Sequence, residues 1–248
     1  MEMNGRAVIV TGGASGIGRA TAMLLAHEGA RVFIGDIDEA GGAATAESAR
    51  AAGGNAEFLP VDLQQPESIT TFAAAVHDRV ERVDGLVNGA GWDRIQPFIE
   101  NPPEMWEDLI AINLLGAVRL TRAVLPPMIA AQAGKIVNIS SDAGRVGSTG
   151  ETVYAAAKGG LIAFTKSLAR EMARYRLNVN CVCPGPTDTP LFRRQPERMQ
   201  EALTRAIPFR RVAQPEDIAE AVMFFLGGRS DYITGQVLSV SGGLTMVG

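Results

Sequence analysis

The chain has 248 residues, of which 46% are hydrophobic and 20% are charged, and its formal net charge is −4. This composition is typical of a soluble globular protein with one sizeable core, and the lack of a basic patch argues against nucleic acid as a partner. We find no apolar leader before the first predicted strand and no apolar run of the roughly eighteen residues that span a bilayer. We therefore expect a cytoplasmic protein with no membrane partner.

Residues that commonly bind metals are few. His27 and His77 fall in predicted helices far from other ligand types, so we expect no metal site. Cys181 and Cys183 lie on an alternating run, and we expect their side chains on opposite faces of a strand, unable to form a bridge.

A glycine-rich turn follows the first predicted strand, residues 6–11. Gly12, Gly16 and Gly18 precede a helical pattern from 19 to about 28. A strand, a glycine turn and a helix N-terminus form a cradle for a pyrophosphate, because the backbone approaches the ligand where side chains are absent. The spacing differs from G-x-G-x-x-G, and glycine alone is weak evidence because loops collect it for steric reasons.

The second predicted strand, residues 31–36, ends in an acid. A carboxylate at Asp36 accepts hydrogen bonds from adenosine ribose hydroxyls and repels a 2′-phosphate, which selects NAD over NADP. The alternative is a helix cap, by Asp36 or Asp38, for the predicted helix 39–52. We favour the ribose role for Asp36 and the cap for Asp38.

Strands and helices alternate through the rest of the chain. Further strands are predicted at 56–61, 85–88, 135–140, 177–183 and 236–240, and helices from Pro66, over 103–131, through Tyr154 to about 174, and over 215–226. This order predicts an α/β protein with a doubly wound parallel sheet of about seven strands, helices on both faces and one domain over 1–248. The irregular, arginine-rich residues 190–213 are predicted to form a substrate lid.

Tyr154 and Lys158 are four residues apart on a predicted helix, so their side chains leave the same face. A nearby ammonium favours the phenolate and is expected to lower the tyrosine pKa, which suits an acid/base for an alcohol or ketone. Ser141 follows a buried strand and lies where active groups gather. The pair alone is ordinary on an amphipathic helix, and Asn113, in an apolar setting, could be an ordinary core asparagine.

In combination, these motifs resemble the short-chain dehydrogenase/reductase family over essentially the whole chain. The matching residues are Thr11 to Gly18, Asp62, Asn88 to Gly91, Asn113, Ser141, Tyr154 with Lys158, and Pro184, Gly185 and Thr189. Gly89 departs from the family, which more often has a second asparagine there. The fold implied is a single-domain Rossmann fold, and family members are commonly homotetramers.

The resemblance implies a role for each matching residue. Tyr154 would be the acid/base, Lys158 would lower its pKa and bind the nicotinamide ribose, Ser141 would hold the substrate oxygen, and Asn113 would hold a water linked to Lys158. The cofactor NAD would be bound by Gly12, Gly16, Ile17, Gly18, Asp36, Asp62, Leu63, Asn88, Ala90, Tyr154, Lys158, Pro184, Gly185, Thr187 and Thr189.

A narrower resemblance concerns the substrate. Trp92 with Asp93, and the segments 141–148, 183–189 and 233–246, are similar to 2-hydroxycyclohexanecarboxyl-CoA dehydrogenases of aromatic and alicyclic acid degradation. This implies NAD-dependent oxidation of a secondary alcohol beside a CoA thioester, or of a similar β-hydroxyacyl-CoA. Arginines of the lid could pair with CoA phosphates, or could be solvated surface charges.

Other functions stay open. A 3-oxoacyl-[acyl-carrier-protein] reductase usually prefers NADPH and has basic residues near the glycine turn, where this chain has Ala14, Ser15 and Asp36. A dehydrogenase of free secondary alcohols is a further alternative. A catalytically silent NAD-binding regulator should have lost Tyr154, Lys158 or Ser141, and none of them is lost. A serine hydrolase would need a G-x-S-x-G motif, which the sequence lacks.

Overall fold

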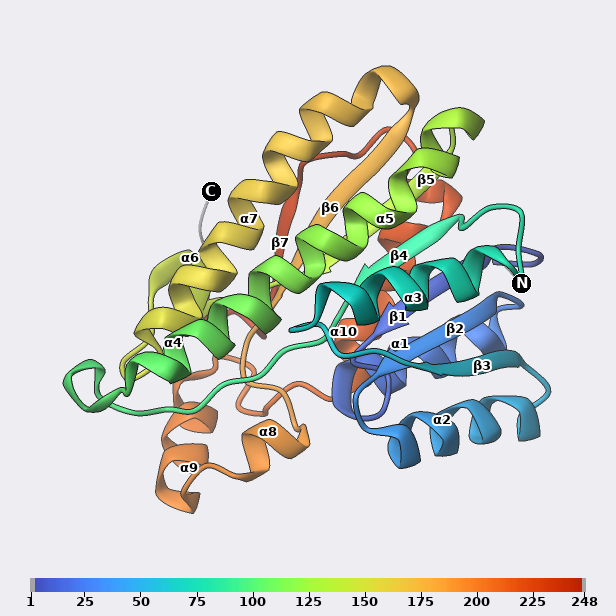
Figure 1. Ribbon diagram of the computed structural model, residues 1–248. Coiled ribbons are helices and arrows are strands. Elements are labelled where there is room, and N and C mark those ends of the chain that lie inside the picture. The colour runs from blue at the N-terminus through green and yellow to red at the C-terminus, as the bar shows by residue number, and fades with distance from the viewer. Residues whose placement is uncertain (1–2, 247–248) are drawn as a thin grey trace.

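A seven-stranded, fully parallel sheet forms the centre of the computed structural model, which describes residues 3–246 (Figure 1). The strand order is β3-β2-β1-β4-β5-β6-β7. The strands are β1 (Ala7–Thr11), β2 (Arg31–Asp36), β3 (Asn55–Pro60), β4 (Gly85–Asn88), β5 (Gly134–Ile139), β6 (Leu177–Pro184) and β7 (Val237–Val240). The predicted single-domain doubly wound fold is confirmed, and the order of winding reverses between β1 and β4, which opens a crevice at the carboxyl ends of these strands.

Helices cover both faces of the sheet (Figure 1). The main helices are α1 (Gly16–His27), α2 (Glu39–Ala51), α3 (Pro66–His77), α4 (Pro103–Ile110), α5 (Gly116–Ala131), α7 (Thr152–Met172) and α10 (Pro215–Leu226). α1, α2 and α10 pack on one face, and α3, α5 and α7 pack on the other. The strands β1, β2, β4, β5 and β6 are therefore buried between two helical layers, which explains their near-continuous apolar runs, whereas the edge strands β3 and β7 are only partly covered.

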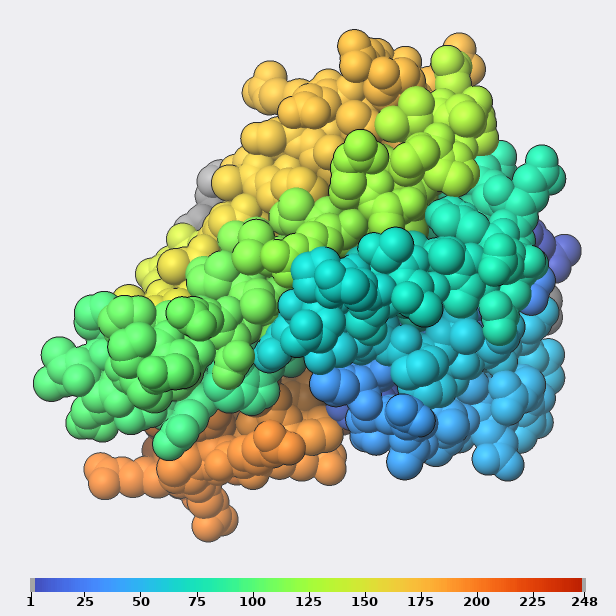
Figure 2. Space-filling view, viewed as in Figure 1, coloured from blue at the N-terminus to red at the C-terminus, as the bar shows by residue number. Residues whose placement is uncertain are grey.

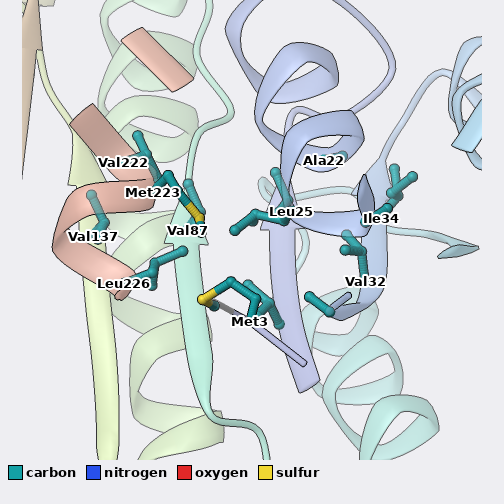
Figure 3. Packing of buried hydrophobic residues seen from close by; sticks show 14 of the residues in the cluster. Met3, Ala22, Leu25, Val32, Ile34, Val87, Val137, Val222, Met223 and Leu226 are labelled. Atoms are coloured by element: carbon teal, nitrogen blue, oxygen red, sulfur yellow. The ribbon is translucent and has the colours of Figure 1, made fainter. Parts of the chain in front are cut away.

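The hydrophobic core consists of one cluster on each face of the sheet. On the first face, Leu25 of α1 and Val222 of α10 pack towards strand residues such as Val32 and Val87 (Figure 3). Phe33, Phe72 and Leu120 belong to the second cluster. Burial of these side chains holds the sheet rigid, so the loops at its carboxyl edge have a fixed base.

The predicted helix over 103–131 is interrupted by a π-helical turn, Ala111–Leu115, between α4 and α5. This stretch of 29 residues is long and apolar enough to cross a membrane by length and composition, and 44% of its most apolar window is buried inside the protein. The core helix of a soluble protein passes the same test, and α5 packs against α3.

The arginine-rich segment 190–213 is more regular than its sequence predicts. It contains α8 (Pro190–Arg193) and α9 (Glu197–Ala206). In Figure 2 this segment, in orange, forms a lobe on the same side of the molecule as the lobe around residues 98–110, in green. We refer to residues 190–206 as the arm.

The prediction for the cysteines was wrong. Cys181 and Cys183 are both fully buried, and their sulfur atoms are 3.9 Å apart. Side chains alternate along a strand, so residues two positions apart share a face, and the expectation of opposite faces miscounted this period. Both remain free thiols.

Candidate active site

A cleft of about 930 Å³ lies at the carboxyl edge of the sheet. Most of the predicted site residues line it: Gly12, Gly16, Ile17, Gly18, Asp36, Asp62, Leu63, Ala90, Ser141, Tyr154, Lys158, Pro184, Gly185, Thr187 and Thr189. Asn88 and Asn113 do not. Residues from loops that are far apart in sequence are thus brought to one cavity, because parallel strands end at the same edge.

The turn between β1 and α1 is packed so closely that two of its positions have no room for a side chain in the present conformation. A Cβ atom on Gly18 would lie 2.1 Å from the carbonyl oxygen of Gly12, and a Cβ on Gly12, whose φ is +72°, would lie 2.7 Å from the Cα of Ala90. Ser15, at the N-cap of α1, makes no capping hydrogen bond with its side chain. The first N–H groups of α1 therefore point into a side-chain-free cradle, which fits a pyrophosphate.

Asp36 lies at the end of β2 and is fixed by the backbone. One carboxylate oxygen accepts a hydrogen bond from the Ala14 N–H at 2.9 Å, and the other accepts one from the Asp38 N–H at 3.0 Å. The cap predicted for Asp38 is confirmed, because its side chain accepts from the Gly41 N–H at 3.0 Å at the start of α2. Asp36 keeps acceptor capacity towards the cleft, which fits two ribose hydroxyls.

The other residues predicted to meet a dinucleotide also lie along the cleft. Asp62 accepts a hydrogen bond from the Gln64 N–H at 2.9 Å, which holds the loop that carries Leu63. Thr187 donates to the Gly185 carbonyl at 2.9 Å, and Thr189 caps α8 by accepting from the Phe192 N–H at 3.3 Å. Together with the glycine cradle and Asp36, these groups fit a nicotinamide dinucleotide.

Ser141, Tyr154 and Lys158 meet at the far end of the same cleft. The Lys158 side chain is only 3% exposed, and its ammonium donates to the Ile139 carbonyl at 3.0 Å and lies 5.7 Å from the centre of the Tyr154 ring. The Ser140 hydroxyl donates to the Lys158 carbonyl at 2.8 Å, which ties α7 to the end of β5. The helical spacing and the strand end thus place the three groups as the sequence predicts.

The electrostatics of Tyr154 differ from the prediction. Burial raises the pKa of the phenol, the Glu151 charge raises it further, and the Ser141 hydrogen bond, which lowers it, does not compensate. Burial also lowers the pKa of Lys158 to about 8. The expected lowering of the tyrosine pKa was therefore wrong for this structure, because desolvation and the charge of Glu151 both raise the pKa.

Asn113 belongs to the π-helical turn and does not line the cleft. Backbone groups hold its side chain. Its amide donates to the carbonyl oxygens of Trp92 at 2.7 Å and Leu109 at 3.0 Å, and its carbonyl accepts from the Trp92 N–H at 3.2 Å. A Cβ on Gly91 would lie 3.1 Å from the Asn113 oxygen and 3.3 Å from the Lys158 nitrogen, so both side chains flank this glycine. Asn113 thus fixes the loop after β4 beside Lys158.

Asn88 was predicted to line the cofactor groove, and the structure places it elsewhere. Its amide donates to Thr121 at 3.0 Å and to Asn138 at 2.8 Å, and Asn138 in turn donates to Thr165 at 2.8 Å. These polar side chains are all buried and link β4 and β5 to α5 and α7. Asn88 therefore supports the floor of the cleft from behind.

Three residues of the site were not assigned a role from the sequence. The Thr11 hydroxyl accepts from the N–H groups of Gly89 at 3.1 Å and Ala90 at 3.3 Å, so it joins the ends of β1 and β4. Asp93 and Glu151 line the cleft near Tyr154. Thr11 and Asp93 belong to motifs that the sequence displays, whereas nothing in the sequence links Asp93 to Glu151.

Metal ligands do not gather in this cleft. Within residues 3–246, no three His, Cys, Asp or Glu side chains are placed to hold a metal ion. The cleft combines a hydroxyl, a phenol and an ammonium with a dinucleotide cradle. These groups form the site of an oxidoreductase for alcohols and ketones.

Comparison with known proteins supports this class. The family model described as "Enoyl-(Acyl carrier protein) reductase" matches residues 12–245. The chain belongs to the short-chain dehydrogenase/reductase family. It is 37% identical to the 3-oxoacyl-[acyl-carrier-protein] reductase FabG of Thermotoga maritima, over 99% of this chain and 100% of that protein. It is also 37% identical to the FabG of Escherichia coli, over 100% of both chains.

Solved structures show the same similarity. The crystal structure of gox2181 superposes with a TM-score of 0.95, at 32% identity, and the match covers 98% of this chain and 96% of the other. A single-residue variant of the actinorhodin polyketide ketoreductase, solved with NADPH, superposes with a TM-score of 0.92, at 36% identity, over 96% of this chain and 97% of the other. The FabG relatives carry the name of the alternative function and not that of a 2-hydroxycyclohexanecarboxyl-CoA dehydrogenase.

Proposed function

We propose that this oxidoreductase interconverts a 3-oxoacyl thioester and the corresponding 3-hydroxyacyl thioester with NAD(H). The observation that carries this proposal is a single cleft with Ser141 and Tyr154 at one end and the acidic Asp36 at the other. The first pair suits a carbonyl or hydroxyl oxygen of the substrate, and Asp36 suits an unphosphorylated ribose.

Each polar group at the reacting end has a distinct task. The Ser141 hydroxyl and the Tyr154 phenol hold the substrate oxygen, and the phenol delivers a proton to that oxygen as the ketone is reduced. A bound nicotinamide supplies the hydride for reduction and accepts it in oxidation. Lys158 stabilises the phenolate left behind, and the Ile139 carbonyl holds its ammonium at 3.0 Å.

The raised pKa of Tyr154 agrees with a role as proton donor, which is the role that reduction requires of it. A phenol that keeps its proton is ready to act as a general acid, whereas oxidation needs the phenolate. The names of the FabG relatives, which are reductases, support the same direction.

The choice of cofactor rests on Asp36. A 2′-phosphate placed on this ribose would face a carboxylate, which disfavours NADP(H). The similar polyketide ketoreductase was solved with NADPH, so the proposal of NAD(H) depends on the charge of Asp36 and not on that similarity. We expect NAD(H) for this chain.

The names of the relatives support an acyl carrier protein as the carrier of the thioester. A second candidate is the oxidation of a 2-hydroxycyclohexanecarboxyl-CoA, which Asp36 and the motif segments around Trp92 and Ser141 favour. Of the arm arginines, Arg193 pairs with Asp188, and Arg205 pairs with Glu201. Exposed Arg194 and Arg198 on the arm suit CoA phosphates better.

We further propose one catalytic domain over residues 1–248, with residues 190–213 as a substrate lid, assembled as a cytoplasmic homotetramer. Ala156 and Ala163 are exposed on α7, where small side chains permit close approach of a second copy. Light scattering is expected to give about four times the chain mass of 26.2 kDa. A species of single-chain mass would contradict the assembly.

The function is tested by following the nicotinamide absorbance with purified protein. The substrates are 3-oxobutyryl-acyl carrier protein and acetoacetyl-CoA with NADH or NADPH, and 2-hydroxycyclohexanecarboxyl-CoA with NAD or NADP. Preference for the acyl carrier protein thioester with NADH supports the first candidate, and preference for the cyclic thioester with NAD supports the second. Turnover of simple ketones but of no thioester would contradict both.

A further inference from the structure

Two acidic side chains at the substrate end of the cleft have no part in the chemistry described above. Asp93 follows Gly91 and Trp92 in the loop after β4, and Glu151 lies three residues before Tyr154 at the start of α7. Both line the same cleft as Ser141 and Tyr154. They are therefore positioned to touch a substrate.

The backbone brings the two acids together. The Gln96 N–H donates to the Gly150 carbonyl at 2.9 Å, which joins the loop after β4 to the turn before α7. Glu151 occupies the N-cap position of α7, but its side chain does not cap the helix. It acts instead on the Asp93 side chain, whose pKa it raises through hydrogen bonding and through its charge.

A hydrogen bond between two carboxyl groups requires a proton, because ionised carboxylates only accept. Asp93 is 9% exposed, and its Oδ1 atom is buried without a hydrogen-bond partner. Burial, then the hydrogen bond and charge of Glu151, raise the pKa of Asp93 to about 8, although the Arg94 N–H and the Lys158 charge act in the opposite direction. At neutral pH Asp93 therefore keeps its proton, and the charge of Glu151 is one of the causes.

We propose that Asp93 and Glu151 act as a proton-sharing carboxyl pair that donates a hydrogen bond to the thioester carbonyl of the substrate and repels free 3-oxo acids. This inference rests on the proposed function and adds how the cleft selects its substrate class. A thioester carbonyl is a neutral acceptor and gains the hydrogen bond. A free carboxylate meets the negative charge of the pair, and a simple ketone has no second carbonyl to accept.

The position of the pair agrees with the distance between the two carbonyls of the substrate. In a 3-oxoacyl thioester, only one carbon separates the reacting carbonyl from the thioester carbonyl. The reacting oxygen is expected on Ser141 and Tyr154, and Asp93 and Glu151 line the same cleft and raise the pKa of the Tyr154 phenol. The pair is thus next to the site where the second carbonyl must lie.

The test compares three ketones with NADH: the uncharged acetoacetyl-N-acetylcysteamine thioester, acetoacetate, and 2-butanone. We expect the native protein to prefer the thioester and to use acetoacetate least. Asp93→Ala removes the donor, so kcat/KM for the thioester should fall about tenfold more than kcat/KM for 2-butanone, the effect of one lost hydrogen bond. Glu100→Gln, which changes an exposed acid on the same loop, is the matched control. It should leave kcat/KM for the thioester and for acetoacetate, each relative to 2-butanone, unchanged.

Two conservative variants separate the hydrogen bond from the charge. In the native protein the thioester preference should fall above about pH 8, where Asp93 loses its proton. Asp93→Asn keeps a hydrogen-bond donor and leaves Glu151 in place, so its thioester preference should persist without that fall. The double variant Asp93→Asn with Glu151→Gln also removes the charge, and kcat/KM for acetoacetate should rise about tenfold. If Asp93→Ala fails to fold, these two variants are sufficient to test the carboxyl pair.

The outcomes distinguish this inference from the proposed function. Equal losses on all three ketones in Asp93→Ala, or an unchanged acetoacetate rate in the double variant, would overturn the carboxyl pair as a selector and leave the thioester reductase standing. Native protein that reduces 2-butanone but not the thioester would overturn the proposed function itself.

Discussion

At the level of single residues, burial of the Tyr154 phenol has a kinetic consequence. Tyr154→Phe removes the proton donor but keeps the ring, so we expect turnover to fall by at least ~10²-fold while NADH affinity is retained. Steady-state reduction of a 3-oxoacyl thioester and NADH fluorescence titration measure the two effects. Tyr232→Phe is the control, because Tyr232 is fully exposed and lies outside the cleft. A Tyr154→Phe variant with most of its activity would exclude this residue as the acid.

We expect the carboxylate of Asp36 to control a second kinetic property, the ratio of kcat/KM with NADH to that with NADPH. Asp36→Ala removes two charge-assisted acceptors and the repulsion of a 2′-phosphate, so the ratio should fall at least about tenfold. Asp38→Ala is the matched control, two residues away. It removes the α2 cap, costs about 1 kcal/mol of stability and should leave the ratio unchanged. An unchanged ratio in Asp36→Ala would remove Asp36 from the ribose site.

At the level of elements, the β1–α1 turn depends on the absence of a side chain at Gly18. In Gly18→Ala the new methyl group would lie 2.1 Å from the Gly12 carbonyl oxygen, so the turn must shift. We expect a loss of about 1–3 kcal/mol in the free energy of unfolding and weaker NADH binding. Gly228→Ala is the control, because no atom lies within 4 Å of a Cβ built there. Denaturant unfolding of both variants makes the comparison, and equal stabilities would contradict a close-packed turn.

The same elements show what the sequence could and could not predict. Apolar runs with turn residues between them predict the strands closely, because the five inner strands are buried on both faces. The π-helical turn at Ala111–Leu115 was not predicted, since its hydrophobic pattern is that of a continuous helix and only the backbone hydrogen bonding, such as Gly116 N–H to the Ala111 carbonyl, distinguishes it. Helix α9 was missed because its sequence is mostly polar and, in the structure, it buries no residue.

At the level of the whole molecule, most of the candidate site could be predicted from residue types in known motifs. These motifs follow the ends of parallel strands, and the sheet topology brings those ends together at one edge. Ser141, Tyr154 and Lys158 follow from this rule. The pairing of Asp93 with Glu151 does not, since it depends on how two loops meet, as the Gln96–Gly150 hydrogen bond shows. The Tyr154 pKa was mispredicted for a related reason: the sequence displays the nearby cation, whereas the extent of burial is a property of the folded chain.

The buried charges of the cleft also set how the stability of the whole protein depends on pH. The pKa of Asp93 is raised from 3.8 to about 8, so between these values the folded protein binds more protons than the unfolded chain and stability falls as pH rises. The pKa of Lys158 is lowered from 10.5 to about 8, so above about pH 8 its contribution has the opposite sign and stability rises with pH. The summed contribution of Asp93 and Lys158 to the free energy of unfolding is therefore lowest near pH 8.

The variant Asp93→Asn removes the contribution of Asp93 to this pH dependence, because an amide does not titrate. Comparison with the native protein therefore isolates that contribution. The difference in melting temperature, variant minus native protein, should grow by at least about 2 °C between about pH 5 and about pH 8. Other titrating groups are common to both proteins and cancel in this difference. Glu100→Gln should give a difference that does not change with pH. A constant difference for Asp93→Asn would mean that Asp93 is already ionised at about pH 5, and the proton shared with Glu151 would then be excluded.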